Sequence, residues 1–168
     1  MKILILALPR TGSTSLLYKI GDEKKLTPIF EPFDKSDRDT YKSSDNNIVV
    51  KTMIYHKYEE DKPQIETHIN LCREFDEIIL LTRKDLKQCA ESWSYLQHHK
   101  GDKFNSVQQY QWELTPNFND EYNNILKWNE EINEISRILN IKLTYYEDIY
   151  DINSYEKYRK EIKVDKLI

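Results

Sequence analysis

The segment from Pro9 to Ser15 combines a cation, a glycine and three consecutive hydroxyl side chains directly after an apolar run. Free N–H groups at the start of a helix, together with the helix dipole, attract negative charge. Gly12 allows the backbone to approach a phosphate closely, and the hydroxyls add short donors. The guanidinium of Arg10 has a fork geometry that matches an oxyanion. The sequence therefore predicts an anion site in this loop.

Two other interpretations of the loop stay open. Ser13 or Thr14 alone accounts for a capped helix, which requires neither Arg10 nor a preceding strand. A nucleoside triphosphate site requires the pattern G-x-x-x-x-G-K-[ST]. Here Ala7 stands at the first glycine position and Ser13 at the lysine position, so the lysine that binds β- and γ-phosphates is missing. An ATP or GTP enzyme is therefore the weaker interpretation.

The elements that must position this loop are predicted from hydrophobic periodicity. Continuous apolar runs predict buried strands over Ile3–Leu8, Ile48–Thr52, Glu77–Thr82 and Ile141–Tyr145. Helical spacing predicts helices over Ser13–Ile20 (ended by Gly21), Pro63–Phe75, Asp85–Gln97, Asp120–Leu139 and Ser154–Ile162. This alternation predicts one P-loop-like α/β domain over residues 1–168, with three α/β/α layers around a mainly parallel sheet. Ligands bind beyond the carboxyl ends of such strands.

Composition and charge narrow the class of protein. The chain has 168 residues, a length that suits one domain with its own core. Its net charge of −4 argues against a broad nucleic-acid-binding face. The apolar run Ile3–Leu8 is short for a secretion signal, and no run reaches the ~18 residues of a membrane span, so we expect a cytoplasmic protein. Cys72 and Cys89 are expected to be small buried thiols, neither disulfide-bonded nor bound to a metal.

The residues Pro9-Arg10-Thr11-Gly12-Ser13-Thr14-Ser15-Leu16 are similar to the 5′-phosphosulfate loop of the sulfotransferases. Those enzymes use 3′-phosphoadenosine 5′-phosphosulfate as the sulfuryl donor. The resemblance therefore implies this donor for the chain, with adenosine 3′,5′-bisphosphate as the product and no metal. It also implies that Arg10 and the N–H groups of the loop stabilise charge on the transferring group.

Arg83 and Ser92 supply a second match to the same family. Family members carry an arginine at this strand end and a serine about nine residues later, and the resemblance implies that both bind the donor's 3′-phosphate. Arg83 can make two charge-assisted bonds to a phosphate. Ser92 reaches it only if its helix runs past the site. The alternative is that Arg83 pairs with Asp85 or Glu91 on the surface and Ser92 is an ordinary helix serine.

The late part of the chain matches the family less well. We find no Arg-Lys-Gly element of the kind that often completes 3′-phosphate binding, and Arg159 or Lys160 is the substitute that the sequence offers. The segment Tyr145-Tyr146-Glu147-Asp148-Ile149 resembles the late Tyr-Glu-Asp-Leu segment of the family, for which we expect a structural role.

The segment Phe30-Glu31-Pro32-Phe33 resembles the Glu-Pro motif of many carbohydrate sulfotransferases. The resemblance implies that Glu31 is the base that takes the proton of the acceptor's hydroxyl group. The alternative is a surface glutamate in a turn, because a following proline favours an extended backbone at Glu31.

The segment Val49-Val50-Lys51-Thr52 is similar to a family strand whose lysine contacts the transferring group. Cytosolic members place a catalytic histidine directly after Lys-Thr, whereas Met53 stands here. This departure favours the glutamate-base type, and His56, three residues later, is the rival base.

The expected function is transfer of a sulfuryl group to a hydroxyl of a small-molecule, carbohydrate or peptide acceptor. The residues expected to line an acceptor cleft, unless they belong to the core or its rim, are Tyr95, His98, His99, Tyr110 and Trp112. The polar stretch Asp34–Asn47 is a candidate lid. Two alternatives remain: a P-loop nucleotide kinase-like phosphotransferase, and a non-catalytic relic that binds a nucleotide, another anion or a partner.

Overall fold

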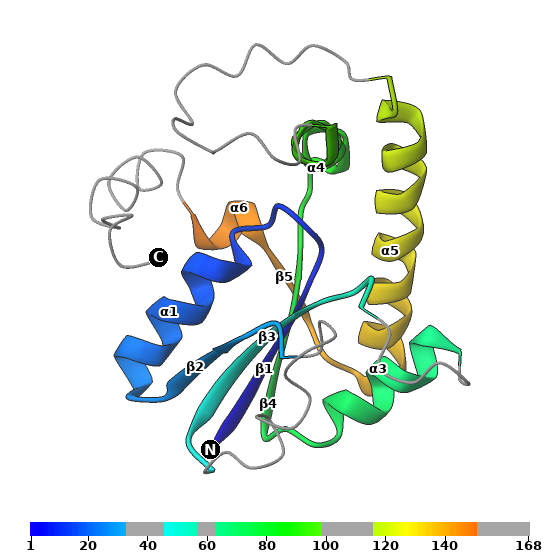
Figure 1. Ribbon diagram of the computed structural model, residues 1–168. Coiled ribbons are helices and arrows are strands. Elements are labelled where there is room, and N and C mark those ends of the chain that lie inside the picture. Colours follow the sequence, from blue (N-terminus) through cyan, green and yellow to red (C-terminus); the bar gives the residue numbers. More distant parts are fainter. Residues whose placement is uncertain (33–45, 57–62, 99–115, 151–168) are drawn as a thin grey trace.

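A computed structural model describes residues 1–32, 46–56, 63–98 and 116–150, and every structural statement below concerns these ranges (Figure 1). Five parallel strands form one sheet in the order β2-β3-β1-β4-β5. The strands are β1 (Lys2–Ala7), β2 (Thr27–Phe30), β3 (Ile48–Met53), β4 (Glu77–Thr82) and β5 (Leu143–Tyr145). The prediction of an α/β fold with a parallel sheet is therefore confirmed.

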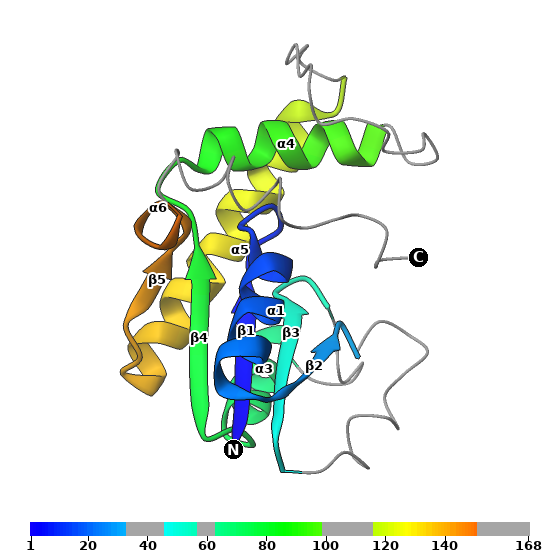
Figure 2. The same cartoon turned by 90° about the vertical axis from the view of Figure 1, so that its left-hand side faces the viewer.

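Helices cover both faces of the sheet and its carboxyl end. They are α1 (Ser13–Lys24), α3 (Gln64–Cys72), α4 (Leu86–His98), α5 (Phe118–Leu139) and α6 (Tyr146–Ile149). Helix α1 lies on one face, and α3 and α5 lie on the other (Figure 1). Helix α4 crosses above the carboxyl ends of the strands instead of covering a face (Figure 2).

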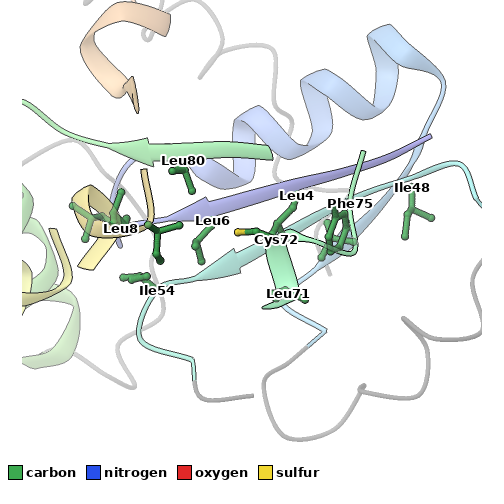
Figure 3. Close-up of a cluster of buried hydrophobic side chains, with 12 residues drawn as sticks. Leu4, Leu6, Leu8, Ile48, Ile54, Leu71, Cys72, Phe75 and Leu80 are labelled. Atoms are coloured by element: carbon green, nitrogen blue, oxygen red, sulfur yellow. The ribbon is translucent and has the colours of Figure 1, made fainter. Parts of the chain in front are cut away.

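The core has two halves because successive side chains of a strand point to opposite faces. Leu4 and Leu6 of β1 face the α3 and α5 side, where they pack in one cluster with Leu71 and Leu80 (Figure 3). Ile132 of α5 belongs to the same cluster. The alternate residues of β1 pack with α1 on the other face. This double burial explains why β1 reads as an uninterrupted apolar run.

The order of the strands places a topological switch point between β1 and β4. The connection that leaves β1 leads through α1 to β2 at one edge of the sheet. The connection that leaves β4 leads through α4 and α5 to β5 at the other edge. Open parallel sheets bind ligands in the crevice outside the carboxyl ends of two such strands. The loops that follow β1 and β4 are therefore the first places to look for a site.

One local expectation is wrong, and the structure has two elements that the sequence did not predict. Helix α1 does not end at Gly21 but continues to Lys24, and Lys25 takes the left-handed C-cap conformation. Gly21 instead leaves room for the returning chain, because a Cβ there would lie 3.2 Å from the carbonyl oxygen of Leu26. Strand β2 and helix α6 were not expected.

No helix within the described ranges is both long and apolar enough to cross a membrane.

Candidate functional site

The loop between β1 and α1 is held in a tight, left-handed turn. Arg10 and Gly12 have φ values of 61° and 68°, and Gly12 is the N-cap of α1. The hydroxyl of the fully buried Thr11 donates to the carbonyl oxygen of Leu8 at 2.7 Å. The first bond of α1 runs from the N–H of Leu16 to the carbonyl oxygen of Gly12. The earlier N–H groups therefore have no partner inside the helix, which is the arrangement that an anion site needs.

Gly12 is constrained by two tyrosine rings, while the close approach to a phosphate that the sequence predicts for it stays a prediction. A Cβ at this position would lie 3.0 Å from ring atoms of both Tyr146 and Tyr150. The hydroxyl of Tyr150 also donates to the carbonyl oxygen of Gly12 at 3.1 Å. Two constraints therefore act on Gly12. Its φ is positive, and its lack of a side chain leaves room for the rings of Tyr146 and Tyr150.

Helix α4 runs past this loop and binds it directly. Arg10 donates from Nε to the Oγ of Ser92 at 2.8 Å, and the Sγ of Cys89 donates to the carbonyl oxygen of Pro9 at 3.0 Å. Ser92 is therefore at the site, as its expected role requires. Burial raises the pKa of the Cys89 thiol to about 12, as it does for Cys72. Both thiols are buried, as expected, and stay protonated at neutral pH.

Arg83 follows β4 and reaches across to the same loop. Its Nη1 donates to the carbonyl oxygen of Arg10 at 3.2 Å, and its Nη2 donates to the amide oxygen of Gln88. The side chain is only 12% exposed and its ion-pair partner is Glu147, with 3.6 Å between Nε and Oε1. The expected alternative, a surface pair with Asp85 or Glu91, is therefore wrong.

A second cluster surrounds the buried Lys51 at the carboxyl end of β3. Its Nζ donates to the Oε1 of Glu31 at 2.5 Å and to the Oγ1 of Thr14 at 3.1 Å. The side chain of Lys51 is 3% exposed. Burial lowers its pKa below the ordinary value of 10.5, although the hydrogen bond and the charge of Glu31 act in the opposite direction. Lys51 therefore links the segment after β2 to the first turn of α1.

Glu31 is held at the site by its backbone as well as by its side chain. Its N–H donates to the carbonyl oxygen of Lys51 at 2.9 Å, which extends the pairing of β2 with β3 by one residue. Its φ of 43° is left-handed, so the expected extended backbone before Pro32 is wrong. The side chain is 16% exposed, and its Oε2 lies 3.8 Å from the Nε2 of His56. Both candidate bases thus lie side by side.

Some candidate residues are not brought together. Ser13 is buried and Ser15 half-buried in the first turn of α1, and Tyr95 is half-buried on α4. His99, Tyr110, Trp112, Arg159, Lys160, most of the stretch Asp34–Asn47 and the side chain of His98 lie outside the described residues. The expected acceptor cleft, lid and late basic element consequently remain predictions.

The sequence assigned no site role to Gln88 or Tyr150, and it gave Tyr146 and Glu147 only a structural role, as part of the Tyr-Glu-Asp segment after β5. All four contact residues of the site. Glu147 accepts hydrogen bonds from the N–H groups of Lys84 and Asp85 at 3.0 and 3.3 Å. This agrees with the structural role expected for that segment.

Three cations lie near the β1–α1 loop: Arg10 belongs to the loop, Arg83 bonds its backbone, and Lys51 bonds Thr14 in the first turn of α1. Two carboxylates, Glu31 and Glu147, partly balance their charge. Within the described ranges no three His, Cys, Asp or Glu side chains gather as metal ligands would. Arg83 also borders an open hollow of about 430 Å³ toward α5, with Asn129 and Tyr145 among its walls.

Comparisons with known proteins add no relative. No protein-family model matches the chain, and no curated protein matches it. The candidate site therefore stands on the contacts of this chain alone.

Proposed function

We propose that this protein is a sulfotransferase, which transfers a sulfuryl group from 3′-phosphoadenosine 5′-phosphosulfate to a hydroxyl group of an acceptor. One observation carries the proposal: segments that the sequence marks separately meet at one end of the sheet. Arg10 bonds Ser92, Arg83 bonds the backbone of Arg10, and Lys51 bonds both Thr14 and Glu31.

The donor set fits a ligand with two anionic ends. The first turn of α1 and Lys51 suit one end, where the N–H groups and the Nζ act together on negative charge. Arg83 and Ser92 suit the other. The Oγ of Ser92 accepts a hydrogen bond from Arg10, so its own proton is left to donate to a phosphate. A nucleotide that carries both a 5′-phosphosulfate and a 3′-phosphate has this charge distribution.

When bound, the donor supplies a sulfuryl group whose bond to the bridging oxygen breaks as a bond to the acceptor's oxygen forms. The Oε2 of Glu31 takes the acceptor's proton, because its Oε1 is already bonded to Lys51. Positioned bases of this kind contribute roughly 10²–10⁴-fold in rate. Lys51 and the N–H groups of α1 stabilise the charge that stays on the bridging oxygen with the bond's electron pair.

Thermal unfolding with three nucleotides tests the proposal. Adenosine 3′,5′-bisphosphate is expected to raise the Tm more than AMP or ADP does. At about 100 times its dissociation constant, a ligand stabilises the folded protein by roughly 2.7 kcal/mol. Tighter binding of ATP with magnesium, without a preference for the 3′-phosphate, would instead favour a nucleotide kinase. Binding of the bisphosphate without transfer of labelled sulfate to any hydroxyl acceptor would favour a non-catalytic relic.

Variants connect this preference to the site. Ser92→Ala is expected to weaken the binding of adenosine 3′,5′-bisphosphate more than that of AMP. Arg137→Ala is the matched control, because Arg137 pairs only with Glu134 on the exposed face of α5 among the described residues. If Ser92→Ala and Arg137→Ala bind both nucleotides alike, the assignment of the 3′-phosphate to this end of the site is wrong.

A further inference from the structure

We propose that Glu147 is a positioning residue, which turns the guanidinium of Arg83 so that its two Nη groups face the donor's 3′-phosphate. This inference rests on the proposed function and adds to it a residue outside the loops identified from the sequence. Among the described residues, Glu147 contacts the side chain of Arg83 and the backbone N–H groups of Lys84 and Asp85. We infer that its effect on the ligand is exerted through Arg83.

The carboxylate of Glu147 is fixed at the junction between β4 and α4. Its Oε2 accepts the N–H of Lys84 at 3.0 Å and its Oε1 accepts that of Asp85 at 3.3 Å. Burial raises the pKa of Glu147, but these N–H groups and the charge of Arg83 outweigh burial, so the pKa lies below its ordinary value. The group is thus a fixed negative charge beside the start of α4 at neutral pH.

This carboxylate determines which edge of the Arg83 guanidinium faces the β1–α1 loop. The Nε edge faces Glu147 at 3.6 Å, and within the described ranges this buried Nε has no hydrogen-bond partner. The Nη1 and Nη2 groups point the other way, toward the backbone of Arg10 and the side chain of Gln88. Each Nη carries two N–H groups, so the second N–H of each can donate to a phosphate, and the two together can form two parallel hydrogen bonds.

The aromatic ring next to Glu147 fixes the plane of the guanidinium. The Cζ of Arg83 lies 4.7 Å from the ring centroid of Tyr146, within the range of a cation–π contact. The same ring packs against Gly12. Helix α6, which lies beside the first turn of α1 (Figure 1), therefore holds Arg83 and the β1–α1 loop in one arrangement.

Isothermal calorimetry with adenosine 3′,5′-bisphosphate and AMP tests the inference. The readout is the ratio of the two dissociation constants, because general loosening of the structure weakens both nucleotides and leaves the ratio unchanged. Glu147→Gln keeps the shape of the side chain but removes the charge and one acceptor. We expect the preference for the 3′-phosphate to fall about tenfold or more, as for one misplaced charge-assisted bond, with AMP binding changed less than threefold.

Asp148→Asn is the matched control. Asp148 is the next acid on α6, and it pairs with the exposed amino group of Lys84 instead of with Arg83. This variant is expected to keep the wild-type preference. If Glu147→Gln does not fold, Glu147→Asp keeps the charge, withdraws the carboxylate by one methylene, and is expected to lower the same ratio.

The outcomes separate the two proposals. A wild-type protein with equal affinity for the two nucleotides contradicts the proposed function, and this inference with it. A wild-type preference that Glu147→Gln retains in full, even if both nucleotides bind equally more weakly, overturns the positioning role and leaves the proposed function standing. The double variant gives a further check. If Arg83→Lys lowers the ratio, and adding Glu147→Gln to it lowers the ratio no further, Glu147 acts through Arg83.

Discussion

Lys51 is a buried lysine whose charge is balanced by one carboxylate, and this makes its protonation sensitive to pH. Burial lowers its pKa below 10.5, with Glu31 opposing that shift. Because sulfuryl transfer uses the protonated amine, kcat/KM is expected to decrease on the alkaline side at a pH below 10.5. In Lys51→Arg the guanidinium stays charged, so this decrease moves to higher pH. Lys24→Arg, at an exposed position, is the control and is expected to leave the alkaline decrease at the wild-type pH. If Lys51→Arg leaves it there as well, Lys51 has no part in the mechanism.

Glu31 and His56 compete for the role of base because they lie 3.8 Å apart. We expect Glu31→Gln to lower kcat by about 10²–10⁴-fold and His56→Gln to have the smaller effect. Transfer of labelled sulfate to a panel of sugars and phenols provides the assay, with Glu23→Gln on the exposed side of α1 as the control. A larger loss in His56→Gln would assign the base to the histidine.

At the residue scale, the sequence could predict that the segments after β1, β3 and β4 lie at the same end of the sheet, but not which partners their side chains take. The spacing of hydroxyls after Gly12 identified the loop. The bond between Arg10 and Ser92 joins residues 82 positions apart, and it depends on how α4 crosses the sheet. The ion pair between Glu147 and Arg83 could not be predicted for the same reason, because nothing in the sequence around Glu147 indicates a partner 64 residues earlier in the chain.

The element that ties the site together is the turn between β1 and α1, and Gly12 is its most constrained residue. Gly12→Ala places a side chain at a φ of 68° and 3.0 Å from two tyrosine rings. Strain of this kind costs about 1–3 kcal/mol, so urea unfolding is expected to show a loss of at least that size. Gly12→Asn tolerates the backbone conformation better, and any loss that remains in it reports the contact with the tyrosines.

Ser15→Ala is the control for this prediction, because it changes the same turn without a positive φ. Its free energy of unfolding is expected to stay within about 0.5 kcal/mol of the wild type. Equal stability of Gly12→Ala and Ser15→Ala would mean that the tyrosines of the late segment do not pack on the loop as described.

At the element scale, the strength of the periodic signal decided what could be predicted. The interior strands are buried on both faces, and their continuous apolar runs identified β1, β3 and β4 to within a residue or so. Strand β2 was missed because it is a four-residue edge strand that contains Pro28 and is largely exposed. Gly21 was misjudged because glycine marks both helix ends and close approaches, and only the packing of Leu26 distinguishes the two.

At the scale of the whole molecule, the free energy of unfolding and the binding of a nucleotide are expected to depend on different residues. Ile132 is fully buried in the core between the sheet and α5 and is not one of the candidate site residues. Ile132→Ala is expected to lower the free energy of unfolding by about 2–5 kcal/mol, measured in urea. Its preference for adenosine 3′,5′-bisphosphate over AMP is expected to equal that of the wild type. Loss of that preference would show that the site depends on the core and not only on its own contacts.

The central claim is that one ligand bridges the first turn of α1 and the end of β4. A crystal structure of the protein with adenosine 3′,5′-bisphosphate tests it most directly. We expect the 3′-phosphate within hydrogen-bond distance of Arg83 and Ser92, and the 5′-phosphate against the N–H groups of α1 near Lys51. A nucleotide bound elsewhere, or one seated with its 5′-phosphate on Arg83, would contradict the account.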